Sequence, residues 1–132
     1  MSEGPLFLTL DEVVRIHADM LARYGGADGV RDLGLVESAI HQPKAGFGDE
    51  PFCKDLAEMA AAYLFCLTKN HGFVDGNKRT GTAAAVVFLK LNGVRLTPDE
   101  DGIADLAERI AASQATSEDA VRFFRDRIVL EE

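Results

Sequence analysis

The sequence predicts an all-α fold, a compact bundle of about six helices with a central buried helix pair. Apolar residues recur at helical spacing in six segments, and no segment alternates between polar and apolar residues for long enough to require a sheet. Segment 52–70 is apolar on most sides near its end, which is typical of a helix at the centre of a core, and segment 77–91 is a second apolar helix. The 132 residues, 47% of them hydrophobic, suit one domain, so we expect a single domain over residues 1–132.

The first two predicted helices lie in the N-terminal third of the chain. The first begins at the capping box Thr9-Leu10-Asp11-Glu12 and ends at Gly25-Gly26. His17 lies in its apolar stripe, where a hydrogen-bonded, partly buried histidine is commoner than a functional one, so we place it outside the site. The second helix is expected from Asp32 to Gln42 and is ended by Pro43, which biases Gln42 away from helical backbone.

The segment between Pro43 and Pro51 has no helical period, and it is predicted to be a loop or a small irregular flap. Phe47 stands between two glycines within it. That arrangement suits a plain surface connection and a substrate-positioning element equally well, so both interpretations of residues 44–50 stay open.

The other helices follow in the second part of the chain. A long helix is expected from Phe52 to about Asn70, and the next from Asn77 to Leu91, where Gly81 is expected to let a neighbouring helix approach closely. Capping signals at residues 97–100 and at Thr116 predict the last two helices. Residues 93–96 are the only short candidate for a strand.

Charge and composition exclude several classes of function. The formal net charge of −8 argues against binding to a phosphate backbone, so no direct contact with nucleic acid is expected. The longest apolar run, residues 59–67, is shorter than the roughly 20 residues that span a membrane, and residues 1–5 lack the features of a secretion signal. Cys53 and Cys66, placed about 20 Å apart along one helix, are expected to be unbridged, reduced thiols, as in a cytoplasmic protein.

The stretch most informative about function is residues 71–79, His-Gly-Phe-Val-Asp-Gly-Asn-Lys-Arg, in the turn between the two central helices. The start of the second helix exposes unpaired backbone N–H groups that attract an anion, and Gly76 lets a bound group come close. Asp75 supplies a carboxylate where a magnesium ion shared with substrate phosphates would sit. Lys78 and Arg79 add positive charge. A nucleotide phosphate chain with Mg²⁺ is therefore the ligand that fits best.

The other side chains of this stretch are assigned from their chemistry. Histidine is the residue type whose ordinary pKa lies nearest neutrality, so His71 suits a general base that takes the proton of an attacking hydroxyl. Phe73 and Val74 are expected to be core anchors that pin the turn. A polar, charged turn is also a common connection between helices, so the residue types alone leave an ordinary helix cap as an equal alternative.

The same nine residues resemble the signature of the Fic superfamily, His-x-Phe-x-(Asp/Glu)-Gly-Asn-(Gly/Lys)-Arg, in its death-on-curing (Doc) branch, and the similarity extends from Thr9 to Asn92-Gly93. The resemblance implies a function for each matching residue. His71 would activate the target hydroxyl, and Asp75 would hold Mg²⁺ on the nucleotide phosphates. The other expected roles are an anion hole at Gly76, orientation of phosphate and target by Asn77, and phosphate binding by Arg79.

Three departures from the wider Fic pattern bear on the reaction. Gly72 replaces a proline, which is expected to loosen the turn. Lys78 replaces a glycine and Thr82 replaces a second arginine, and members that transfer AMP use those two residues to seat the distal phosphates. Lys78 would crowd these phosphates, whereas the Doc branch is expected to bind the nucleotide in the reverse direction with its γ-phosphate facing His71.

The resemblance therefore implies a Doc-like toxin of a type II toxin–antitoxin system. Such an enzyme is a protein kinase-type phosphotransferase that moves the γ-phosphate of ATP, with Mg²⁺, to a serine or threonine hydroxyl and blocks translation. Elongation factor Tu is the target expected from the family. AMP transfer to a protein hydroxyl and a non-catalytic module that docks the antitoxin are the alternatives. Because the only Glu-Gly pair is Glu3-Gly4, no inhibitory Fic segment is expected, and restraint would come from a separate antitoxin.

Overall fold

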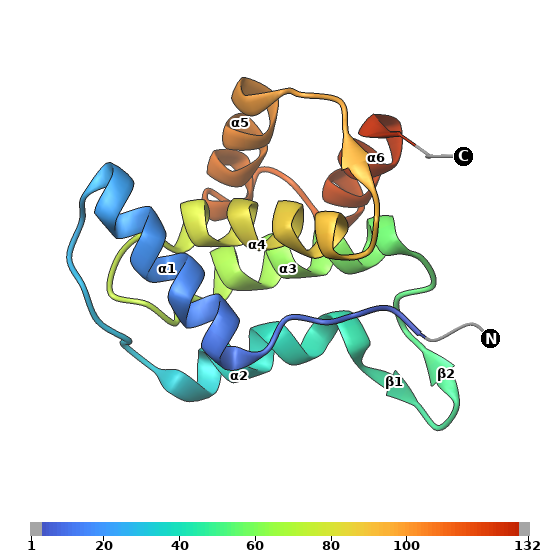
Figure 1. Cartoon of the computed structure of the whole chain (residues 1–132), viewed down its shortest axis with the longest axis horizontal. Coiled ribbons are helices and arrows are strands. Elements are labelled where there is room, and N and C mark those ends of the chain that lie inside the picture. The colour runs from blue at the N-terminus through green and yellow to red at the C-terminus, as the bar shows by residue number, and fades with distance from the viewer. Residues whose placement is uncertain (1–3, 130–132) are drawn as a thin grey trace.

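Six α-helices form the part of the chain that the structure, a computed structural model, describes, residues 4–129 (Figure 1). The helices are α1 (Leu10–Tyr24), α2 (Leu33–His41), α3 (Leu56–Asn70), α4 (Asn77–Leu91), α5 (Glu100–Ala111) and α6 (Ser117–Arg127). A 3₁₀ turn, η1 (Gln42–Lys44), follows α2. Two short antiparallel pairs complete the fold, β1 (Gly46–Phe47) with β2 (Glu50–Pro51) and β3 (Arg95–Leu96) with β4 (Ile128–Val129). The predicted all-α class is confirmed.

The central pair is α3 and α4, which pack against each other more extensively than any other two described elements (Figure 1). Small residues on both helices make this contact close. A Cβ atom on Gly81 would lie 3.0 Å from Thr68 Oγ1 and 3.1 Å from the carbonyl oxygen of Leu64. The close approach expected at Gly81 is confirmed, and α1, α2, α5 and α6 pack around the pair.

A helix of this fold typically begins directly after a residue whose side chain accepts a hydrogen bond from a backbone N–H group. Both bonds of the predicted capping box join Thr9 and Glu12. The predicted starts of two other helices are wrong: α3 begins at Leu56 rather than Phe52, and α5 is capped by Asp99 rather than Thr97. The aspartates decide both starts, because Asp55 accepts a bond from the N–H of Glu58 at 2.9 Å and Asp99 accepts one from Gly102 at 3.0 Å.

The chain between α2 and α3 is more regular than its sequence indicates. Gln42 has helical backbone, with φ −55° and ψ −41°, so the prediction that Pro43 would turn it away from the helical region is wrong. Proline fits the first turn of η1 because no N–H is needed there. The expected flap is a hairpin of two two-residue strands, too short for an alternating pattern to appear. Phe47 at its tip is 83% exposed.

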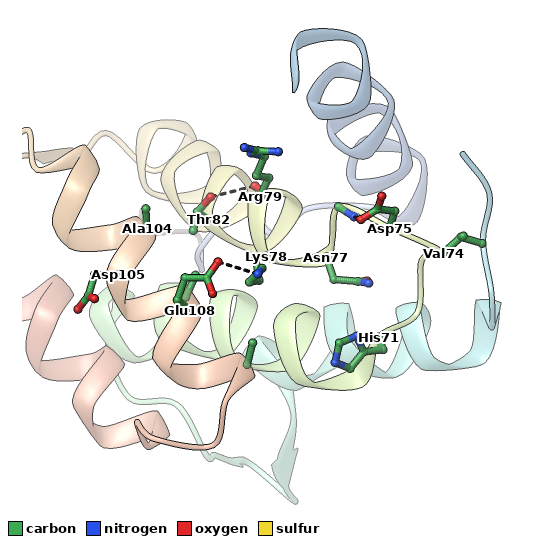
Figure 2. Close-up of a pocket in the computed structure, with 13 residues that line it drawn as sticks. His71, Val74, Asp75, Asn77, Lys78, Arg79, Thr82, Ala104, Asp105 and Glu108 are labelled. Atoms are coloured by element: carbon green, nitrogen blue, oxygen red, sulfur yellow. Dashed lines mark hydrogen bonds and ion pairs between the residues drawn. The ribbon is translucent and has the colours of Figure 1, made fainter. Parts of the chain in front are cut away.

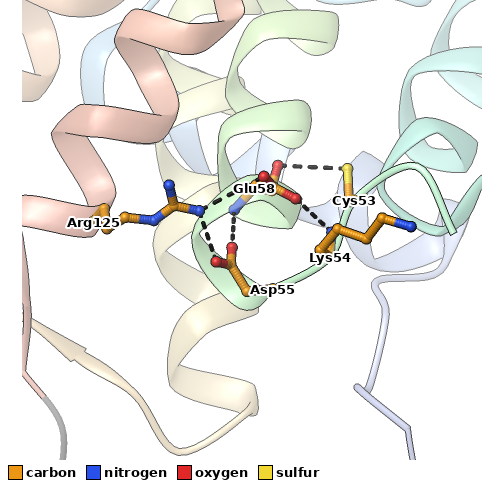
Figure 3. A network of polar contacts seen from close by, with 5 residues as sticks. All are labelled: Cys53, Lys54, Asp55, Glu58 and Arg125. Carbon is orange, nitrogen blue, oxygen red and sulfur yellow. Dashed lines mark hydrogen bonds and ion pairs between the residues drawn. The ribbon is translucent and has the colours of Figure 1, made fainter.

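Cys53 precedes α3, so the two cysteines do not lie on one helix as predicted, although both thiols are free. Burial raises the pKa of the Cys66 thiol to about 11. A polar network surrounds the start of α3 (Figure 3). In it, Arg125 of α6 pairs with Asp55 at 2.7 Å and with Glu58 at 3.6 Å. These pairs are largely exposed and join α6 to α3.

Among the described residues, no helix combines the length and the apolar character that crossing a bilayer requires. Residues Met1–Glu3, which include part of the Glu3-Gly4 pair, lie outside the described range.

The contact at Gly81 predicts the effect of a small substitution. Gly81→Ala should lower the free energy of unfolding by about 1–3 kcal/mol because the added methyl meets Thr68 and the Leu64 carbonyl. Intrinsic helix propensity alone would predict a gain of about 1 kcal/mol. Urea denaturation measures the difference. Gly34→Ala in α2, where the nearest atom is the tip of the Asp32 side chain at 3.3 Å, is the control; a stabilised Gly81→Ala variant would contradict the close packing.

Candidate active site

The loop between α3 and α4 borders a hollow of about 660 Å³ (Figure 2). His71 ends α3 in the left-handed conformation, with φ 51°, and Gly76 precedes α4 with φ 79°. The hollow brings together all the residues that the sequence nominates, namely His71, Asp75, Gly76, Asn77, Lys78 and Arg79. Its second wall, Ala104, Asp105, Ala107, Glu108 and Ala111, comes from α5.

His71 is exposed at the end of the hollow nearest α3 (Figure 2). Its backbone is held from outside the loop, because the Nε of Arg31 donates a hydrogen bond to the His71 carbonyl at 2.7 Å. Left-handed backbone is costly for a residue with a side chain. A fixed backbone with an exposed imidazole is suited to proton transfer at the mouth of the hollow.

The loop is fastened internally by Phe73 and Asn77. Asn77 is buried, and its side chain accepts the N–H of Phe73 at 3.0 Å and donates to the Phe73 carbonyl at 3.0 Å. Phe73 is only 1% exposed, so its predicted role as a core anchor is confirmed. The same prediction for Val74 is wrong: it is 52% exposed and lines the hollow. Phe73 pairs with Val30 in an isolated antiparallel bridge, and the chain bends at Val74, so the two adjacent side chains differ in burial.

His17 of α1 contacts the loop from the core side. It is buried, its ring stacks on Phe73 with 3.8 Å between centroids, and its Nε2 lies 2.8 Å from the backbone carbonyl oxygen of Asp75. Because a carbonyl oxygen only accepts, Nε2 carries the proton. The hydrogen-bonded, buried histidine that the sequence predicts is confirmed. Its contact with a loop residue 58 positions later has no signal in the sequence.

Residues 27–32 run antiparallel to the loop and hold its outer edge. The N–H groups of Arg31 and Asp32 both donate to the Gly72 carbonyl, at 2.8 and 3.0 Å, and the N–H of Val74 donates to Gly29 at 3.0 Å. A Cβ atom on Gly72 would collide with the side chain of Val36. The site has no room for the proline of the wider Fic pattern, and these hydrogen bonds constrain the turn in its place.

Asp75 presents an exposed carboxylate at the rim of the hollow. Its two oxygens accept hydrogen bonds from the backbone N–H groups of Ala27 at 3.2 Å and Gly76 at 2.8 Å. These bonds, that from Ala27 first, lower the pKa of Asp75 below its ordinary value. The described residues contain no cluster of three metal-ligating side chains. A single ionised carboxylate fits Mg²⁺ only when phosphate oxygens and water supply the other ligands.

The two basic residues of the stretch diverge (Figure 2). Lys78 Nζ lies 2.6 Å from Glu108 Oε1 on α5, across the hollow. Arg79 turns toward α1, where its guanidinium lies 4.3 Å from the centre of the Tyr24 ring. Thr82 also lines the hollow, and its hydroxyl donates to the Arg79 carbonyl at 2.9 Å. The sequence therefore predicted the positive charges but not the partners that orient them.

Glu108 and Asp105 are site residues that reasoning from the sequence missed. They stand three positions apart on a helix, so they share a face, and both line the hollow. That spacing is visible in the sequence, but the element that the face opposes is not. Only the packing of α5 against α4 brings Glu108 to Lys78.

The sequence of this chain is similar to those of known proteins. Residues 7–89 match the Fic/DOC family. The chain is 45% identical over 94 residues to "Toxin Doc" of Mycolicibacterium smegmatis (strain ATCC 700084 / mc(2)155), which covers 70% of this chain and 70% of that protein. It is 36% identical over 104 residues to "Protein kinase doc" of Escherichia phage P1, covering 79% of this chain and 81% of that protein.

Replacing His17 tests how the loop is positioned. His17→Phe keeps an aromatic ring against Phe73 but leaves the Asp75 carbonyl without its donor, so unfolding should become easier by about 1–3 kcal/mol. Amide hydrogen exchange in residues 72–76 should accelerate. His41→Phe, at an exposed position at the end of α2, is the control and should stay within about 0.5 kcal/mol. Unchanged exchange in the loop would rule out positioning by His17.

The lowered pKa of Asp75 predicts its behaviour in acid. A carboxyl whose pKa is lower in the folded than in the unfolded chain stabilises the fold above the unfolded value, and this contribution disappears as pH falls through the folded value. NMR titration should therefore give Asp75 a midpoint below 3.8 in the folded protein. The same residue in the urea-unfolded chain is the control. Equal midpoints in the two states would show that the bonds from Ala27 and Gly76 do not act on the charge.

Proposed function

Because the chain belongs to the Fic/DOC family, we propose that it transfers the γ-phosphate of ATP, with Mg²⁺, to a serine or threonine hydroxyl of a protein. The observation that carries this proposal is the convergence of His71, Asp75 and the N-terminus of α4 on one hollow. A base, a carboxylate and a set of unpaired N–H groups are the parts that phosphoryl transfer requires.

Each residue has a defined task in the proposed reaction. The target hydroxyl loses its proton to the His71 imidazole while its oxygen forms a bond to the γ-phosphorus, and the bond from that phosphorus to ADP breaks. The backbone N–H groups at the start of α4 stabilise phosphate charge, assisted by Lys78 and Arg79. The Asn77 side chain is engaged with Phe73 and the N–H of Gly76 with the Asp75 carboxylate, so these two groups position the loop. Asp75 would hold Mg²⁺, which neutralises charge on the phosphates when bound.

The direction of the nucleotide separates this reaction from AMP transfer. Lys78 and Thr82 stand where the AMP-transferring pattern has a glycine and an arginine. Lys78 projects into the hollow, where it would crowd distal phosphates placed for AMP transfer. The relative in phage P1 is named a protein kinase, which supports transfer of the γ-phosphate. AMP transfer is the second candidate, since it shares the motif.

The biological role proposed from the relatives is that of a toxin in a type II toxin–antitoxin system, because one relative is named "Toxin Doc". A cognate antitoxin would restrain the enzyme, and the target expected from the family is elongation factor Tu in the cytoplasm. A domain that only docks its antitoxin is the non-enzymatic alternative, and it predicts no covalent change on any target.

The mass of the modified target decides among these possibilities. Purified protein incubated with ATP, Mg²⁺ and elongation factor Tu should add about 80 Da, the mass of a phosphate, rather than the roughly 329 Da of AMP. Label from γ-labelled ATP should appear on the target, and label from α-labelled ATP should not. A translation extract in place of the purified factor tests whether a different protein is the substrate.

His71→Ala should reduce transfer by a factor of at least about 100, since it removes the proposed base. His41→Ala, at the exposed end of α2, is the control and should retain full transfer. Transfer that persists in His71→Ala would contradict the mechanism, and label from α-labelled ATP alone would favour AMP transfer.

A further inference from the structure

The Lys78–Glu108 ion pair occupies the hollow where the phosphates are expected. The two charged atoms are 2.6 Å apart, and they join the first turn of α4 to the facing wall of α5 (Figure 2). Both side chains line the hollow. The positive charge nearest the start of α4 is therefore already neutralised by an internal carboxylate.

The pair is not needed to hold α5 in place. The side chains of Lys78 and Glu108 are 44% and 65% exposed, and exposed ion pairs contribute little to folding. Leu106 and Ile110 of α5 do not line the hollow; they are buried in the core and fix the helix there. Glu108 is thus free to part from Lys78 without loss of the fold.

We infer that Glu108 is a competing anion within the proposed nucleotide site, one that Lys78 must leave before it can contact a phosphate. A triphosphate carries several negative charges and can displace a single carboxylate, whereas a weakly charged ligand cannot. A ligand therefore needs more negative charge to contact Lys78 than it would need without Glu108. This makes Glu108 a specificity-determining residue. The identity of the ligand rests on the proposed function, whereas the competition between Glu108 and an anion for Lys78 does not.

Asp105 offers a matched comparison within the same wall. It lines the hollow one turn before Glu108 on α5, and the described ion pairs do not join it to Lys78. Glu108→Gln and Asp105→Asn each remove one negative charge from the hollow while keeping a side chain of similar shape. Only the first releases Lys78, so the two variants separate the pair from the general electrostatic potential of the hollow.

Calorimetric titration of the full chain at fixed ionic strength tests the inference, with ATP·Mg²⁺ and inorganic pyrophosphate as probes and adenosine as the uncharged control. Glu108→Gln should bind both charged probes about threefold or more tightly than the wild type, with adenosine binding unchanged. Asp105→Asn should produce a smaller gain. In a Lys78→Gln background, Glu108→Gln should gain no more than Asp105→Asn does, since the pair with Lys78 is already absent and only the general change in charge is left.

Equal affinities of the wild type and Glu108→Gln for both charged probes would overturn the inference, as would an equal gain from Asp105→Asn. So would a gain from Glu108→Gln that is as large in the Lys78→Gln background as in the wild type. These results leave the proposed function intact if wild-type protein still transfers phosphate. Conversely, a gain for pyrophosphate in a protein that never transfers phosphate would support the competition by Glu108 and contradict the proposed function.

Discussion

The close contact between α3 and α4 is the constraint on which the rest of the structure depends. With no Cβ at Gly81, the two helices approach until neighbouring atoms leave no room for a methyl group. Their facing ends, His71 and Asn77, are then joined by only the five residues 72–76. A short connection between two fixed helices has few available conformations. The loop therefore brings His71, Asp75 and the start of α4 to the same hollow.

Elements distant in the sequence restrict that loop further. His17 bonds the Asp75 carbonyl from the core side, and the backbone of residues 27–32 pairs with its outer edge. Asn77 ties the start of α4 to Phe73. These contacts come from α1, from the segment before α2 and from α4 itself. Pre-positioned groups lose little freedom when a ligand binds, which is how a glycine-containing loop can serve as a precise site.

The sequence predicted the contiguous parts of this arrangement well. The six-helix class, the bounds of α4, and the clustering of His71 with Asp75 follow from local periodicity and from one motif.

Predictions from the sequence failed where tertiary packing determines the position of a residue. Glu108 lines the site only because α5 packs against α4, and His17 contacts the loop only because α1 packs against α4. Val74 was wrongly predicted to be buried because hydrophobicity alone does not decide burial, and single apolar side chains are common on protein surfaces. The starts of α3 and α5 were misplaced because the caps, Asp55 and Asp99, are identified only by the backbone N–H groups that they bind in the structure.

The left-handed backbone of His71 has a consequence for how this sequence can change. Such a conformation costs a non-glycine residue roughly 1 kcal/mol, and glycine adopts it freely. A glycine there would relieve the strain and remove the imidazole in a single substitution. Loss of the proposed base at position 71 is therefore favoured by stability, so the fold and the proposed reaction place opposite demands on this residue.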